Sequence, residues 1–150
     1  MIRVRVQAAP IDLAAELAAA EADGAGAVAT FTGLVRGDAK EGEGGVELLE
    51  LEHYPGGTEA ALTALAEAAV ARWSLLGASV VHRVGPMRPG ERIVFVATAA
   101  PHRRAALDAC AFLIDRLKTQ APFWKRETRG GESRWVEARA ADDDAATRWD

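Results

Sequence analysis

The chain has 150 residues, of which 49% are hydrophobic, and this is enough apolar surface for one compact domain with its own core. Its net charge of −4 argues against nucleic acid as a partner, and no stretch approaches the roughly 20 uninterrupted apolar residues of a membrane span or the apolar run of a signal peptide. Because Cys110 is the single cysteine, we expect no intrachain disulfide, no cysteine-rich metal site and a cytoplasmic location.

Strands and helices alternate along the chain without a linker. Asp12 is the expected N-cap of the first helix. In chain order we expect a strand at residues 2–6, a helix at 12–22, strands at 27–35 and 46–54, a helix at 58–73, strands at 79–84 and 92–99, a helix at 101–120, and a polar hairpin turned at Gly130 and Gly131. A short connection rich in glycine and proline joins the two strands before the third helix, as in a hairpin.

Two segments offer little that could be buried. Residues 37–45, rich in glycine and charge, predict a mobile surface loop that becomes ordered when a ligand binds. Residues 141–150 predict a short acidic tail.

Antiparallel strand pairs beside three helices predict a single α+β domain with a mostly antiparallel sheet, like an α/β-hammerhead. A nucleotide-binding Rossmann unit is not expected, since no G-x-G-x-x-G turn follows a strand.

The most informative segment spans residues 118–127, where two lysines bracket a proline and the aromatic pair Phe-Trp. A helix that reaches Pro122 must stop before it, so Lys118 belongs to the last helical turn and Lys125 to the extended segment that follows. Amines placed in this way can converge on one anion, above an apolar floor formed by both aromatic rings. The alternative is that the lysines only favour the helix dipole and that the aromatic pair belongs to the core.

A second cluster, His102, Arg103 and Arg104, stands where a strand ends and the third helix begins. Free backbone amides and the positive end of the helix dipole favour an anion there, and the side chains add donors for a phosphate. The alternative is that His102 caps the helix and the arginines face water.

Arg36, at a strand end before the glycine-rich loop, is a candidate for a buried cation that meets a ligand. His53 is expected to make structural hydrogen bonds rather than to act as a catalyst.

The third helix also carries Cys110. Apolar residues at helical spacing accompany it on one face, at positions 107, 111, 114 and 117. We therefore interpret Cys110 as a small buried residue rather than a nucleophile.

Six segments of the chain, in order, resemble the large, catalytic subunit of molybdopterin synthase. They cover residues 31–36, 51–56, 82–85, 102–103, 117–127 and 134–136. The match extends from about residue 2 to residue 139, and six dispersed segments in the right order are far more specific than any one of them.

The resemblance implies a defined reaction. The family converts cyclic pyranopterin monophosphate to molybdopterin by placing two sulfurs on the pterin side chain as a dithiolene. The sulfur arrives as a thiocarboxylate on the C-terminal Gly-Gly of a small ubiquitin-like partner subunit, so no cofactor and no metal is implied. By residue match, Lys118 and Lys125 are catalytic, and the substrate is bound by Arg36, His102, Arg103 and Phe31.

The length of the third helix adds an expectation of its own. If the helix is continuous, 16 residues separate His102 from Lys118, which is roughly 24 Å along the axis. One pterin cannot touch both. Either the helix is broken, or His102 and Arg103 serve the pocket of a second copy of the chain. We prefer the second arrangement, a homodimer with an isologous interface, which becomes a heterotetramer when each copy binds a small subunit.

Two other classes of function stay open. One is a phosphate-ester or pterin-binding module without catalysis, and the other is a scaffold that binds a ubiquitin-like protein but no pterin. The roles of Arg126, Arg134 and Arg139 are not assigned by the sequence.

Overall fold

The computed structural model describes residues 1–38, 44–136 and 140–150. The strands are β1 (Ile2–Gln7), β2 (Ala27–Leu34), β3 (Leu48–His53), β4 (Gly77–Arg83), β5 (Gly85–Met87), β6 (Arg92–Ala100), β7 (Phe123–Arg129) and β8 (Glu132–Val136). The helices are α1 (Leu13–Glu21), α2 (Gly57–Trp73), α3 (Arg103–Gln120) and α4 (Ala140–Thr147). Every predicted strand and helix is therefore confirmed, with ends that differ by a few residues. No helix of the described residues is long and apolar enough to cross a membrane.

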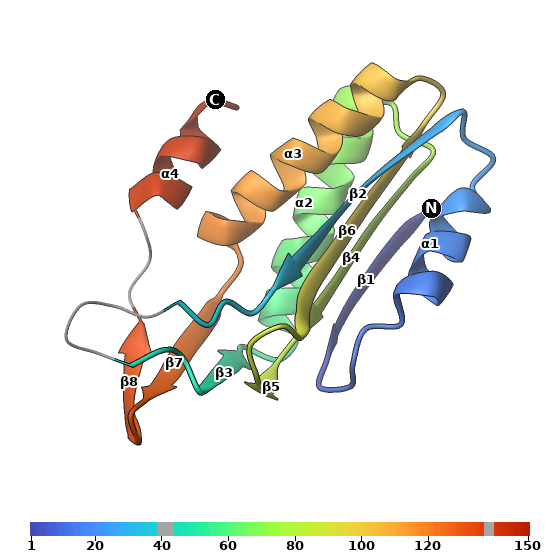
Figure 1. Ribbon diagram of the computed structural model, residues 1–150. Coiled ribbons are helices and arrows are strands. Elements are labelled where there is room, and N and C mark those ends of the chain that lie inside the picture. The colour runs from blue at the N-terminus through green and yellow to red at the C-terminus, as the bar shows by residue number, and fades with distance from the viewer. Residues whose placement is uncertain (39–43, 137–139) are drawn as a thin grey trace.

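The larger sheet has the strand order β1-β4-β6-β2 and forms the centre of the molecule. Helices α2 and α3 lie side by side on one face and α1 covers the other (Figure 1). Strands β4 and β6, buried on both faces, therefore lack the alternation of a half-exposed strand. The prediction of an α+β domain is confirmed. Antiparallel pairing dominates as expected, although β1 pairs with β4 in parallel.

The second sheet, with the order β5-β3-β7-β8, is antiparallel throughout and continues from one end of the first (Figure 1). The connection between β4 and β6, predicted as a simple hairpin link, contains the short strand β5. Gly85 has φ of +84°, which few other residues adopt, and it lets the chain leave β4 and enter the second sheet. The turn predicted at Gly130 and Gly131 is confirmed, with positive φ at both residues.

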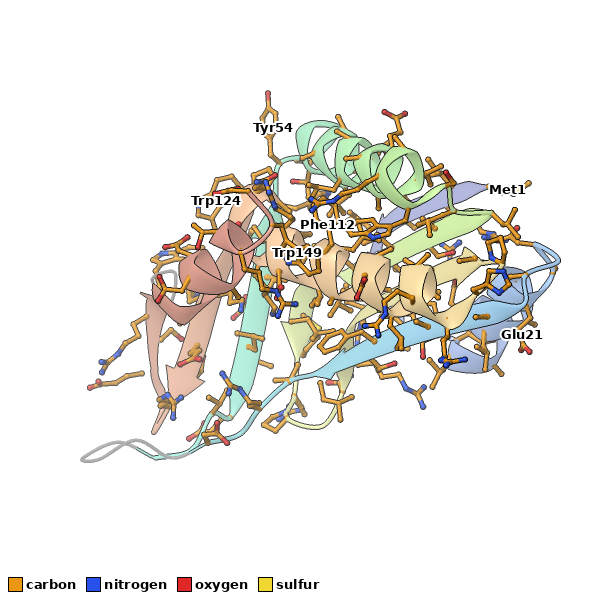
Figure 2. All side chains as sticks on the ribbon, turned by 90° about the horizontal axis from the view of Figure 1, so that it is seen from above. Met1, Glu21, Tyr54, Phe112, Trp124 and Trp149 are labelled. Carbon is orange, nitrogen blue, oxygen red and sulfur yellow. The ribbon has the colours of Figure 1, made fainter. Side chains whose placement is uncertain are left out.

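The segment expected to be an acidic tail folds instead into α4 and docks on α3. Trp149 anchors it: its ring lies edge to face on Trp73 and Phe112, at centroid distances of 5.7 Å and 5.8 Å. Its Nε1 also donates to the Asp115 carboxylate at 2.8 Å. Figure 2 shows Phe112 and Trp149 next to each other where the two helices meet. Burial of this aromatic cluster stabilises a segment that its acidic composition alone would leave exposed.

The buried face of α3 is displaced from the predicted face. Cys110 and Leu117 are buried as expected, but Leu107 is 58% exposed. Ala106 and Leu113 are buried beside Cys110, each one position before the residue predicted to face the core. Cys110 itself is a buried free thiol, as expected.

Candidate active site

The two lysines of the predicted site lie on either side of the turn between α3 and β7. Helix α3 ends at Gln120, and Ala121 is already extended, with φ −89° and ψ 129°, because the following Pro122 disfavours helical backbone. Lys118 lies in the last turn of α3, and Lys125 lies on β7. The prediction of where this helix ends, and of where each lysine stands, is confirmed.

Thr58, at the start of α2, fixes this turn from a distant part of the chain. Its side chain is fully buried and its hydroxyl donates to the carbonyl oxygen of Pro122 at 2.9 Å. The same hydroxyl accepts from the amide of Tyr54 at 2.9 Å. The turn that separates the two lysines is therefore held on α2 as well as by its own backbone. The sequence analysis missed this role.

Replacing Thr58 by valine should lower the free energy of unfolding by about 1–2 kcal/mol, because it leaves the partly buried Pro122 carbonyl and Tyr54 amide without their partner. Urea unfolding measures the change. Thr63→Val, on the same helix but partly exposed, is the matched control and should change stability by less than about 0.5 kcal/mol. Equal losses in both variants would show that the hydroxyl bridge contributes nothing specific.

The floor of the site consists of Phe123 and His82 rather than of Phe123 and Trp124. The rings of His82 and Phe123 stack with centroids 4.0 Å apart and an interplanar angle of 25°. Alternation along β7 turns Trp124 to the other face of the second sheet, where it is 50% exposed. The expectation that both aromatic residues form one floor is therefore wrong. Lys125, two residues after Phe123, shares the face of Phe123.

Electrostatics show that both lysines lie near His82. The pKa of His82 is lowered to about 3, mainly by burial; the positive charges of Lys118, Lys125 and His53 also lower it, and a hydrogen bond to the Arg83 carbonyl opposes them. The imidazole is therefore neutral at physiological pH. The structure thus brings Lys118, Lys125 and His53 around one buried ring, from α3, β7 and β3 respectively. His82 lies in one of the segments that carried the family resemblance, yet the sequence analysis gave it no role in the site.

The choice of lysine at these two positions is informative. The chain has 18 basic residues, but only Lys40, Lys118 and Lys125 are lysines. Two of these three lie close enough to His82 to lower its pKa. Arginine remains protonated at any physiological pH, whereas a lysine amine can lose its proton when other cations surround it. The site is therefore equipped to move protons as well as to hold an anion.

Arg36 and Phe31 both lie on exposed parts of the structure. Arg36 follows β2, and because β2 is antiparallel to β6 it lies at the end of the larger sheet where α3 also ends. Its side chain is 63% exposed and 3.7 Å from the Asp38 carboxylate, so the expectation of a buried cation is wrong. Phe31 lies in the middle of β2, an edge strand, and is partly exposed.

His102 and Arg103 stand at the opposite end of α3 from Lys118. The helix is continuous from Arg103 to Gln120, so the alternative of a broken helix is wrong. His102 is the N-cap residue, but its side chain makes no capping hydrogen bond, so this part of the alternative is wrong. Arg103 and Arg104 are exposed, as the alternative expected. A single copy of the chain therefore does not bring His102 and Arg103 to the lysines.

Arg129 is a further residue that the sequence analysis missed. Its side chain is buried, and its Nη1 donates to the carbonyl oxygens of Asp38 at 2.6 Å and Gly44 at 2.9 Å. It thus fixes both flanks of the glycine-rich segment close to Arg36. The centre of the predicted mobile loop, residues 39–43, and Arg139 lie outside the described residues.

Arg126 projects from the face of β7 that carries Trp124. It pairs with Glu50 at 3.2 Å, and its guanidinium lies 6.0 Å from the centre of the Trp135 ring. Within residues 1–38, 44–136 and 140–150, no three histidine, cysteine, aspartate or glutamate side chains gather to hold a metal ion.

Comparison with known proteins shows the family of the chain. A family model described as "MoaE protein" matches residues 6–120, most of the chain. The chain belongs to the MoaE family. A protein of Ralstonia nicotianae named "Molybdopterin synthase catalytic subunit" is 51% identical over 151 residues, which cover 99% of this chain and 85% of that protein. This relative extends past the family match and includes the region of Lys125.

Solved structures show the same fold. The molybdopterin biosynthesis MoaE protein of Burkholderia ambifaria superposes with a TM-score of 0.84 at 47% identity and covers 99% of this chain and 98% of its own. The molybdopterin synthase structure from Staphylococcus aureus has a TM-score of 0.81 at 32% identity, with 88% and 95% covered. The fold is therefore that of MoaE proteins.

Proposed function

We propose that this chain is the catalytic subunit of a molybdopterin synthase. Its substrates are cyclic pyranopterin monophosphate and the thiocarboxylate tail of a small ubiquitin-like subunit, and its product is the dithiolene of molybdopterin. The observation that carries the proposal is the convergence of Lys118 and Lys125 on one buried neutral histidine, in a chain of the MoaE family.

The chemistry of the reaction suits this site. Thiocarboxylate and cyclic phosphate are both anions, so cations are needed to bring them together and to stabilise the charge that develops when the phosphate ring opens. Each transferred sulfur forms a bond to carbon of the pterin side chain, and water returns the carrier tail to an ordinary carboxylate. A lysine whose pKa is lowered by a neighbouring amine can give and take protons in these steps. Lys118 and Lys125 are the residues to which we assign this role.

The other residues that we assign to the site come together with the two lysines only in a dimer. Arg36 lies at the lysine end of α3, whereas His102 and Arg103 lie at the other end of a continuous helix, roughly 24 Å away. We assign Arg36 and Phe31 to substrate binding within the chain, and His102 and Arg103 to the pocket of a second copy. An isologous homodimer provides this geometry twice.

The relative's name, a catalytic subunit, supports a further subunit in the working enzyme. We assign that place to a small ubiquitin-like sulfur carrier with a C-terminal Gly-Gly thiocarboxylate, one for each copy in a heterotetramer. The reducing cytoplasm, in which a thiocarboxylate is protected from oxidation, is the proposed location.

Reconstitution tests the function directly. The purified chain, the thiocarboxylated carrier and cyclic pyranopterin monophosphate should together form the dithiolene, detected by mass spectrometry of the pterin product. A carrier that ends in an ordinary carboxylate is the control and should give no product. Binding of the pterin without turnover would instead indicate a binding module, and binding of the carrier without any affinity for the pterin would indicate a scaffold.

Cys110 provides a second test, because the proposed sulfur comes from the partner and not from this chain. Burial raises the pKa of the Cys110 thiol to about 11, so the thiol stays protonated and unreactive at neutral pH. Cys110→Ala should reduce the free energy of unfolding by about 1 kcal/mol and leave the rate of dithiolene formation within about twofold of the wild type. A folded but inactive Cys110→Ala variant would require sulfur to pass through this chain.

A further inference from the structure

His82 is held in one defined orientation. Its ring stacks on Phe123, and its Nδ1 lies 2.9 Å from the carbonyl oxygen of Arg83. On β4 it sits between Val6 of β1 and Val94 of β6, so apolar neighbours flank it within the sheet. The stacking on Phe123 and the hydrogen bond to Arg83 together fix the orientation of the imidazole ring.

The hydrogen bond to the backbone decides which ring nitrogen carries the proton. A carbonyl oxygen can only accept, so Nδ1 donates, and in the neutral ring Nε2 is an unprotonated acceptor. With a pKa of about 3 the ring stays neutral at every pH at which the enzyme would work. The unprotonated Nε2 of His82 is therefore a hydrogen-bond acceptor in the region of the Lys118 and Lys125 amines.

We propose that His82 is a positioning residue for sulfur transfer, whose Nε2 accepts a hydrogen bond from the amine of Lys118. This inference rests on the proposed function of the site. Lys118 lies in the last turn of α3, five residues before Phe123, the ring on which His82 stacks, and it lowers the pKa of His82 more than Lys125 does. The amine needs such a support, because it is carried by a flexible four-carbon stem on the last turn of α3.

A neutral acceptor suits this site better than a carboxylate. A carboxylate would hold the amine more firmly, but it would cancel the positive charge that two anionic reactants require. The imidazole directs Lys118 and leaves the charge of the site unchanged. The titratable or charged groups around it are Lys118 on α3, Lys125 on β7, His53 on β3 with Glu59 of α2 at 3.7 Å, and Arg83 on β4 with Glu91 at 3.1 Å.

Two substitutions separate positioning from packing. His82→Asn keeps an amide donor near the place of Nδ1 but has no acceptor at the place of Nε2. His82→Gln is longer and carries a carbonyl oxygen close to that place. His82→Phe keeps the aromatic stack on Phe123, lacks the acceptor, and takes the place of the Asn variant if that protein does not fold. Circular dichroism establishes the fold of each protein.

The first readout is the titration of each amine, measured by trace acetylation of the isolated chain between about pH 6 and pH 11 and by mass spectrometry. In His82→Asn the midpoint of Lys118 should fall by about half a pH unit or more, because its charged form loses an acceptor. In His82→Gln it should stay close to the wild-type value. Lys40, outside the described residues, is the internal control and should not move in any variant.

The second readout is turnover in the reconstituted system. His82→Asn should lower kcat by about tenfold or more with little change in KM, and His82→Gln should restore it to within about threefold of the wild type. A purely structural role would lower stability without moving the Lys118 midpoint.

The outcomes distinguish this inference from the function on which it rests. An unchanged Lys118 midpoint in a folded His82→Asn protein, or equal behaviour of the Asn and Gln variants in both readouts, would overturn the positioning role. A shifted midpoint together with a wild-type protein that forms no dithiolene would support the hydrogen bond and overturn the proposed function instead.

Discussion

Replacing Lys118 by alanine should abolish dithiolene formation while the chain still folds and binds the small subunit. The amine stands at the end of α3 and, like Lys125, acts electrostatically on the buried His82, where the two anionic reactants are expected to meet. Loss of a general acid or base lowers a rate by about a hundredfold or more, and here a positive charge is lost as well. Single-turnover formation of the dithiolene measures the effect, and calorimetric titration with the small subunit confirms binding.

Two further variants sharpen this expectation. Lys118→Arg keeps the charge but cannot release a proton at neutral pH, so it should be nearly as inactive as Lys118→Ala if proton transfer is the role of the amine. Gln120→Ala, an exposed neighbour on the same helical turn, is the matched control and should keep wild-type activity. Lys125→Ala should also be severely impaired. Retention of more than about a tenth of the activity in Lys118→Ala would remove this residue from the mechanism.

The elements that the sequence predicted well are those whose signals are local. The end of α3 is set by Pro122, the turn between β7 and β8 by two adjacent glycines, and the start of α1 by Asp12, whose carboxylate accepts from the amide of Ala15. Each of these signals lies within a few residues of the structure that it determines.

The elements that the sequence analysis missed depend on contacts between distant residues. Helix α4 forms where an acidic tail was expected, because Trp149 finds Trp73 and Phe112, residues 76 and 37 positions away. Strand β5 has only three residues and is defined by its pairing with β3. No pattern among neighbouring residues predicts helix α4 or strand β5.

The same distinction applies to the site. The positions of Lys118 and Lys125 could be predicted, because one proline separates a helical from an extended segment and both lysines lie close to it. His82 and Thr58 could not, since their partners lie 41 and 64 residues away. One signal for His82 was present: it follows the apolar pair Val80 and Val81 in a strand that is buried throughout, and a buried imidazole must have a hydrogen-bond partner.

A mixed dimer of two inactive proteins should recover activity, and this expectation follows from the continuity of α3. Lys118→Ala and Arg103→Ala homodimers should each be inactive, because every pocket has one defect. If Arg103 serves the pocket of the second copy, a dimer with one protomer of each kind has one pocket with both defects and one with none. Co-expression with two affinity tags, followed by sequential purification, should yield mixed dimers with about half the wild-type activity, provided that the two pockets work independently.

A second mixed dimer is the matched control. Lys118 and Lys125 both lie near His82 of their own chain, so a dimer of Lys118→Ala and Lys125→Ala protomers has one defect in each pocket and should stay inactive. Rescue in the Arg103 pairing but not in the lysine pairing would establish that the pocket is shared between copies. Absence of rescue in both pairings, in dimers whose composition is verified, would count against the shared pocket. Because α3 is unbroken over its 18 residues, Arg103 would then have no route to the chemistry at Lys118 and would have to act elsewhere on the protein.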